Sequence, residues 1–179
     1  IQVKEGDVLV HLAGILAFVW LELVYGATGL SIGLRPEIVA VATLVYSAIT
    51  FVAMALFGVE RWIEKGEAFS VYFRMFSTLS PLEVRDGRLG LRRPLAGATR
   101  WGSVPGSLAL VLATIGATSY DGATEGALAS PITETFDLLR DIGLGVVAAC
   151  RVNGTLWMAL VIGGVSLLFL LGIRGMHTV

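Results

Sequence analysis

The stretch VLVHLAGILAFVWLELVYGA, residues 8–27, decides how the rest of the chain is interpreted. It is almost wholly apolar and twenty residues long. Twenty residues of α-helix extend about 30 Å, which matches the hydrocarbon core of a bilayer. The stretch therefore predicts a transmembrane helix, and the carboxylate of Glu22 inside it needs an explanation.

The composition of the whole chain predicts the same class. Of its 179 residues, 55% are hydrophobic and only 15% are charged, and the mean hydropathy is +0.80. Soluble domains carry about 25% charged residues. The net charge of −1 argues against nucleic acid as a partner, because such proteins present a basic surface. With one cysteine, Cys150, and two histidines, His11 and His177, we expect no disulfide, no metal site and no bound cofactor.

Three further segments are apolar enough to cross a bilayer, namely 38–57, 104–120 and 156–173. Pro36 precedes the second span and suits the first turn of a helix, where its missing N–H is not needed. The third span is short, so a tilted or partly re-entrant helix is the alternative there. The predicted fold is all-α: a single membrane domain, residues 1–179, with about four transmembrane helices.

The distribution of basic residues sets the orientation of these spans. The 59–103 loop holds eight of the thirteen Lys and Arg residues. The positive-inside rule places this loop in the cytoplasm. Both ends of the chain are then cytoplasmic, and the 121–155 loop faces outward.

The cytoplasmic loop is expected to carry structure of its own. Residues 61–79 predict one interfacial helix, which either lies on the inner leaflet or packs on other helices of the same protein. The stretch LEVRDGRLGL, residues 82–91, predicts a small β-hairpin that turns at Asp86-Gly87. The aromatic residues expected on one face of the interfacial helix are Trp62, Phe69, Phe73 and Phe76.

Two smaller features complete the pattern. Ser130-Pro131 in the outer loop resembles an N-cap followed by Pro at the first helical position, which predicts a short amphipathic helix. His11 should lie near the inner interface, where its polar tip can reach water. The apolar face expected on the outer helix consists of Phe136, Leu138, Leu139 and Ile142.

A polar seam is predicted between the spans. Glu22 falls in the outer third of the first span, where it should face protein or water, or be protonated, because a charge that faces lipid is costly. Tyr25 lies one turn further along the same face. Hydroxyl-bearing residues share one face of the second span and one of the third; they are Thr43, Tyr46, Ser47 and Thr50, then Ser107, Thr114 and Thr118, with Asp121 at the outer end.

Two interpretations of this seam stay open. In one, the hydroxyl groups only hold helices together, Glu22 is a packing partner, and Asp121 begins the outer loop with a turn. In the other, the seam lines a path for a substrate or an ion, and the path residues are Glu22, Tyr25, Thr50, Thr114, Thr118 and Asp121.

No catalytic motif stands out in the chain. The sequence contains no HExxH, no phosphate-binding P-loop and no GxGxxG; the letters of GxSxG occur once, in GLSIG (29–33), between two predicted spans and not between a strand and a helix. The catalytic residues, if there are any, are therefore unknown, and the sequence leaves open whether the protein is an enzyme.

Three stretches together carry a resemblance: GILAFVWLELVY (14–25), GEAFSVYFRMFSTLSPLEVRDGRLGLRRPLAG (66–97) and GATSYDG (116–122). They resemble a family of uncharacterised polytopic bacterial membrane proteins, some labelled "fenitrothion hydrolase". The resemblance implies a multi-pass protein of the bacterial plasma membrane. Family members are longer, so this chain, which begins with Ile1, is expected to be an internal fragment whose partners are the bilayer and the remaining helices.

Three functions follow as hypotheses. The first is a transport or permease-like role, in which the polar seam leads a small molecule of unknown identity across the membrane. The second, implied by the family label alone, is a membrane-embedded hydrolase of organophosphate esters. The third is a non-catalytic membrane subunit that docks a partner through the cytoplasmic loop.

Overall fold

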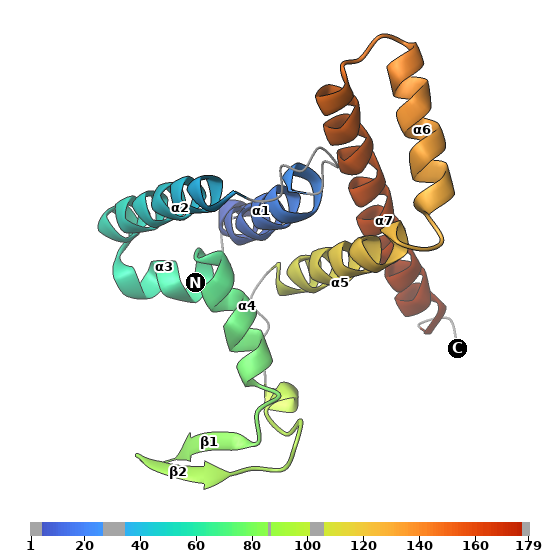
Figure 1. The fold of residues 1–179 in the computed structure, drawn as a ribbon. Helices are drawn as coiled ribbons and strands as arrows, with labels where there is room; N and C mark the ends of the chain where they lie inside the picture. The colour runs from blue at the N-terminus through green and yellow to red at the C-terminus, as the bar shows by residue number, and fades with distance from the viewer. Residues whose placement is uncertain (1–4, 27–34, 86, 101–105, 177–179) are drawn as a thin grey trace. The chain divides into compact units, whose positions relative to one another are not determined.

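The computed structural model describes residues 5–26, 35–85, 87–100 and 106–176, and these are mostly helical with one small hairpin (Figure 1). The all-α expectation is confirmed at this level. A π-helix, Leu21–Tyr25, follows α1 directly, and a 3-10 helix, Ala98–Arg100, precedes α5. The other elements are α1 (Glu5–Trp20), α2 (Pro36–Phe57), α3 (Val59–Lys65), α4 (Ala68–Ser77), β1 (Leu82–Arg85), β2 (Arg88–Leu91), α5 (Ser107–Thr124), α6 (Ala129–Asp141) and α7 (Val146–Met176).

The chain divides into two compact units. The first unit combines Ile1–Gly14 with Ala48–Leu110, and the second combines Ile15–Ser47 with Val111–Val179. The helices α1, α2 and α5 each contribute residues to both units.

Two of the described helices, α2 and α7, are long and apolar enough to cross a membrane, judged by length and composition. They have 22 and 31 residues and mean hydropathies of 2.2 and 2.4, and only 6% of the apolar window in each is buried. The predicted spans 38–57 and 156–173 lie inside them. The apolar helix Val10–Tyr25 is shorter, and residues 27, 104 and 105 of the other two predicted spans lie outside the described residues.

The helix predicted over 61–79 is in fact two helices, α3 and α4, separated at Gly66 and Glu67. Glu67 is the reason for the break, because its carboxylate accepts hydrogen bonds from the backbone N–H groups of Phe69 and Ser70 and so starts a new helix. A side chain at Gly66 would collide with the ring of Trp62. The predicted aromatic face is therefore divided between two helices.

The hairpin predicted over 82–91 is confirmed. Strands β1 and β2 pair antiparallel, with Leu82 opposite Leu91 and Val84 opposite Leu89. Gly87 has a φ of +73°, a conformation that glycine adopts without strain and that a two-residue hairpin turn requires. Its neighbour Asp86 lies outside the described residues.

His11 does not reach water as predicted. Only 1% of its surface is exposed, and its Nδ1 atom lies 3.2 Å from the backbone oxygen of Lys65. Gly14, one turn further along α1, allows close packing, since a Cβ there would lie 2.9 Å from the Cβ of Ala68. The first half of α1 therefore packs against α3 and α4 inside the first unit.

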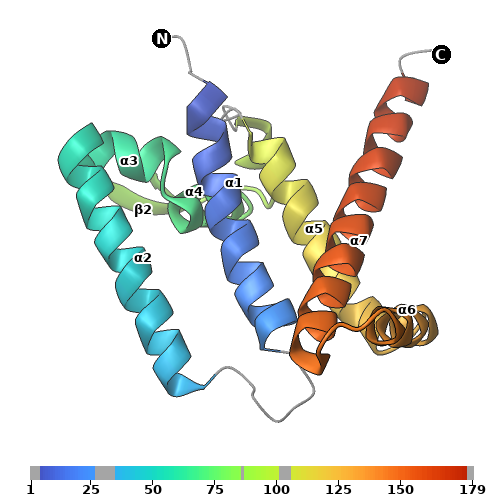
Figure 2. The same ribbon diagram turned by 90° about the horizontal axis from the view of Figure 1, so that it is seen from above.

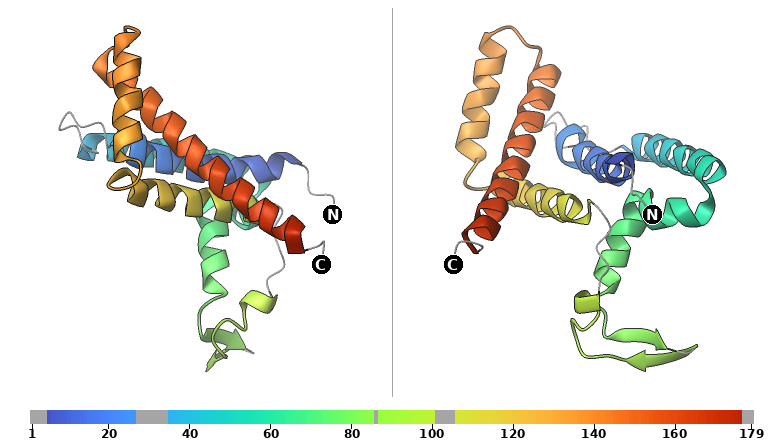
Figure 3. Two further views of the ribbon diagram at one scale, coloured as in Figure 1. Left: turned by 90° about the vertical axis from the view of Figure 1, so that its right-hand side faces the viewer. Right: turned by 180° about the vertical axis from the view of Figure 1, so that it is seen from behind.

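In the second unit, α6 folds back along the first half of α7 (Figures 1 and 3). The short helix predicted after Ser130 is present, but its predicted start was wrong: α6 begins at Ala129, and its N-cap, Leu128, has no side-chain hydrogen bond. Ser130 and Pro131 lie in the first turn, where proline is tolerated because those N–H groups have no helical acceptor. The predicted apolar face was also partly wrong, because Leu138 and Ile142 are 61% and 66% exposed.

The core of the second unit lies where the π-helix, α5 and α7 meet. Its buried residues are Val24, Tyr120 and Met158. Helices α5 and α7 approach closely at Gly116, where a Cβ would lie 2.7 Å from the Cα of Ile162 (Figure 2). Such a contact needs glycine, since small residues let membrane helices come together.

Candidate functional site: an acidic cavity

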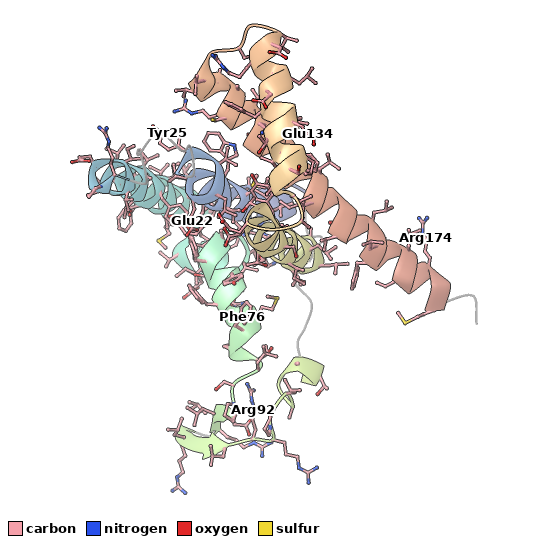
Figure 4. The ribbon with its side chains drawn as sticks, turned by 45° about the vertical axis from the view of Figure 1, so that its right-hand side comes forward. Glu22, Tyr25, Phe76, Arg92, Glu134 and Arg174 are labelled. Atoms are coloured by element: carbon pink, nitrogen blue, oxygen red, sulfur yellow. The ribbon has the colours of Figure 1, made fainter. Side chains whose placement is uncertain are left out.

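Glu22 lies in the π-helix that ends the first apolar segment (Figure 4). The N–H of Gly26 donates to the carbonyl of Leu21 at 3.0 Å, five residues back. A π-helix changes which residues face the same side, and such segments occur frequently at functional sites. Here Val24 is buried at 3% exposure, whereas Glu22 is exposed and lines a cavity.

We call this cavity the acidic cavity; it has a volume of about 670 Å³. Four segments of the second unit form it: the π-helix and the end of α5 with its following turn, then α6 and the first half of α7. Its lining consists of Glu22, Leu23, Val24, Gly26, Tyr120, Asp121, Thr124, Glu125, Ala129, Ile132, Thr133, Phe136, Cys150, Asn153 and Gly154.

The charge of the lining is uniformly negative. Glu22, Asp121 and Glu125 are carboxylates, and no Lys or Arg stands among the lining residues. The three come from two separate elements, since Glu22 belongs to the π-helix while Asp121 and Glu125 flank the C-terminal end of α5. That helix end adds partial negative charge, because its last carbonyl groups have no helical donor. The cavity therefore favours cations.

Tyr120 supplies a neutral polar group to the same cavity. The residue is only 5% exposed, yet it lines the cavity. No hydrogen bond of its hydroxyl is seen within the described residues, and the oxygen is not among the fully enclosed polar atoms that lack a partner. Gly154 lies beside it, since a Cβ there would lie 3.5 Å from the Tyr120 oxygen and 3.2 Å from a methyl group of Val24. A phenol hydroxyl that lines a cavity can donate and accept a hydrogen bond, so it is suited to meet a polar ligand.

A polar clasp joins the cavity wall on α6 to the wall on α7. Asn153, 4% exposed, donates from Nδ2 to the carbonyl of Ile132 at 2.7 Å. The hydroxyl of Thr135 donates to Asn153 Oδ1 at 2.7 Å and accepts from Trp157 Nε1 at 2.8 Å. Each buried polar group of the clasp thereby has a partner, which holds the two helices in one register.

Replacement of Asn153 by Ala is expected to loosen this clasp. The carbonyl of Ile132 and the hydroxyl of Thr135 each lose one hydrogen bond, worth about 0.5–1.5 kcal/mol, although the hydroxyl keeps the carbonyl of Pro131 as an acceptor. Hydrogen–deuterium exchange should show faster exchange along α6, and thermal unfolding should begin earlier. Val152→Ala, at an exposed neighbouring position, is the matched control. Unchanged exchange in α6 would show that the clasp does not hold the helix.

Tyr25 contacts α7 rather than the acidic cavity. The guanidinium carbon of Arg151 lies 4.6 Å from the centre of the Tyr25 ring, a cation–π geometry. Trp20 donates from Nε1 to the hydroxyl of Thr155 at 2.8 Å. These contacts place the aromatic end of the first segment on α7, at positions two residues before and two residues after Asn153.

The other predicted path residues have different surroundings. Thr118 is exposed and donates to the carbonyl groups of Thr114 and Ile115 in its own helix. Thr114 is half-buried in α5, and Thr50 is half-buried in the part of α2 that belongs to the first unit. Of the six predicted residues, Glu22 and Asp121 are brought together in the lining of one cavity.

Sequence reasoning missed Glu125, Tyr120, Cys150 and Asn153 as cavity residues. Asn153 gave a usable signal, because it is an amide inside an otherwise apolar helical pattern with Trp157 one turn further on. Glu125 gave no such signal, since carboxylates are common in loops that are predicted to lie in water. Among the described residues, no group of His, Cys, Asp and Glu is arranged to hold a metal ion.

Comparison of the chain with protein-family models, with curated proteins and with solved structures gave no match. Function is therefore inferred from the residues and their placement alone.

Proposed function

We propose that this chain belongs to a polytopic membrane protein of the bacterial plasma membrane, with four spans, that takes up a small organic cation through the acidic cavity. The role is permease-like, and the cavity is its outward-facing vestibule. Kinship with the polytopic bacterial family that the sequence resembles is part of this proposal.

The lipid-facing character of the helices supports the membrane part. Leu44, Phe51 and Leu56 on α2 are between 69% and 72% exposed, and α7 exposes a similar series. A core helix of a soluble protein would bury such side chains, whereas only 6% of the apolar windows of α2 and α7 is buried. Apolar surface on this scale is stable against lipid and not against water.

The distribution of basic residues supports an outward-facing vestibule. The Lys and Arg distribution assigns the outer side to the end of the first span and to the 121–155 loop. The four segments that line the acidic cavity are the π-helix, the end of α5, α6 and the first half of α7, and by the same rule they are expected on that side. Hydrophilic segments that gather on one side of a bilayer can enclose a water-filled entry.

The single observation that carries the cation assignment is the uncompensated negative lining of the cavity. Three carboxylates face a space of about 670 Å³, which is the size range of sites for small organic ligands. Phe136 and Tyr120 offer aromatic surface in the same lining, which suits an ammonium group with an apolar body. The hydroxyl of Tyr120 adds a directional contact.

Radiolabelled tetraethylammonium is the probe that tests this function. The purified protein should bind it saturably in nanodiscs, and proteoliposomes should take it up faster than protein-free vesicles. Ethanesulfonate, a small organic anion, should not compete. Binding and uptake no greater than in protein-free controls would contradict the proposal.

A further inference from the structure

The β-hairpin of the first unit presents an uncovered apolar face. Leu82 lies opposite Leu91, and Val84 lies opposite Leu89, so all four side chains share one side of the two strands. Their exposed fractions are 51%, 81%, 73% and 72%, respectively. A two-stranded hairpin is marginally stable in water at best. An exposed apolar face of this kind is stable when lipid or protein covers it.

The opposite side of the hairpin carries two arginines and one carboxylate, Glu83. Arg85 and Arg88 are paired directly across the strands and flank the turn, and both are exposed. Like charges opposite one another destabilise an antiparallel pair. An anion between them would offset that repulsion, because guanidinium groups bind phosphate oxygens in bidentate fashion. Arg93, also exposed, follows β2 closely in the chain.

Arg92 fixes the hairpin to α4 (Figure 4). Its guanidinium donates to the carbonyl groups of Ser77, Thr78 and Ser80 at 2.8, 3.1 and 2.7 Å, which satisfies the free carbonyl groups at the helix end. Gly97 packs under the same side chain, where a Cβ would lie 2.5 Å from the guanidinium carbon. The helix end and the hairpin are therefore held as one body.

Helix α4 and the residues just after it also expose apolar side chains. Phe73 and Phe76 on α4 are 63% and 46% exposed, and Leu79, just after the helix, is 43% exposed. Arg74 in the last turn adds a further positive charge. An aromatic and aliphatic surface with arginines along it is typical of segments that lie in the interface of a bilayer.

We propose that the α4–hairpin body docks on the surface of an anionic bilayer. The side chains of Leu82, Val84, Leu89 and Leu91 enter the boundary between headgroups and acyl chains. A two-stranded sheet is thin compared with the bilayer. Arg85 and Arg88, on its other side, therefore lie at the depth of the lipid phosphates. The excess of anionic lipid in cytoplasmic leaflets matches the predicted cytoplasmic position of the 59–103 loop.

This inference rests on the membrane location in the proposed function but not on the ligand of the acidic cavity. Tetraethylammonium binding can therefore fail while lipid docking succeeds, and the reverse is equally possible. The competing occupants of the apolar face are another segment of the same protein and a soluble partner.

Lipid-borne quenching of a fluorescent label separates these occupants. Bimane is attached at Leu89→Cys in a Cys150→Ser background, and the protein is reconstituted into vesicles that contain doxyl-labelled lipid. Gly90→Cys is the matched control, because the neighbouring residue faces the opposite side of the strand and has room for a side chain. In phosphatidylglycerol-rich vesicles, quenching at position 89 should be about twice that at position 90 or more.

The charge requirement is tested in the same assay. Quenching at position 89 should fall in pure phosphatidylcholine vesicles and in the R85Q/R88Q variant. If the label at position 89 were shielded from water but not quenched, protein would cover the apolar face. If the label were exposed to water, nothing would cover the face. Either result overturns the proposal. Equal quenching in neutral and anionic vesicles would overturn the selection of anionic lipid.

Discussion

Tetraethylammonium binding is expected to weaken about 50-fold in the E22Q/D121N/E125Q variant, with roughly 3- to 5-fold from each residue alone. The three carboxylates are the only charged groups in the lining of the acidic cavity as the structure describes it. Each carboxylate acts on a bound cation across a partly hydrated space, so each contributes a modest binding free energy. The three free energies add, so the three fold-changes in affinity multiply. Equilibrium binding in nanodiscs measures the change.

The matched control neutralises acidic residues of α6 that do not line the cavity. Glu134 and Asp137 are exposed on α6 and are absent from the lining. The E134Q/D137N variant should bind tetraethylammonium nearly as well as the wild-type protein, with a small loss that disappears at high salt. If both variants lost affinity equally, the effect would be one of general surface charge and the cavity would not be the site.

Replacement of Gly116 by Ala is expected to destabilise the second unit by about 1–3 kcal/mol, the usual cost of overpacking. The added Cβ would lie 2.7 Å from the Cα of Ile162, and a backbone atom cannot move aside without shifting α7. Because α7 carries Asn153 and Gly154, the same shift should distort the acidic cavity. Thermal unfolding in detergent and tetraethylammonium affinity report the two effects.

Gly122→Ala is the control for this substitution, since it lies on the same helix with no atom within 4 Å of an added Cβ. Alanine there should leave stability unchanged or raise it by up to about 1 kcal/mol through better helix propensity. The same change from Gly to Ala is therefore expected to lower the stability at position 116 and to leave it unchanged or raise it at position 122. A stabilising Gly116→Ala would mean that α5 and α7 do not meet at this contact.

The sequence predicted correctly those elements that are determined by a few neighbouring residues. The Asp86-Gly87 turn with its alternating flanks gave the hairpin in the correct register, and Pro36 marked the start of α2. The prediction failed where two local signals competed. The aromatic spacing over 61–79 favoured one helix, but the carboxylate of Glu67 caps a new helix and outweighs it.

The candidate site could be predicted only in part. Glu22 and Asp121 stood out because ionisable residues at the edge of apolar segments are unusual. The cavity itself depends on the π-helix after Trp20 and on the clasp between Asn153 and Thr135. Neither has a sequence signature, since a π-helix follows no known spacing and the clasp joins residues on two different helices.

The accessibility of Cys150 tests the central claim most directly, because this sole cysteine lines the acidic cavity. A membrane-impermeant maleimide applied to intact cells should label it, and tetraethylammonium should slow the labelling. In a Cys150→Ser background, Asp137→Cys on exposed α6 should also label, whereas Arg93→Cys in the predicted cytoplasmic loop should label only after permeabilisation. Labelling of Cys150 only after permeabilisation, with Asp137→Cys labelled in intact cells, would contradict an outward-facing cavity.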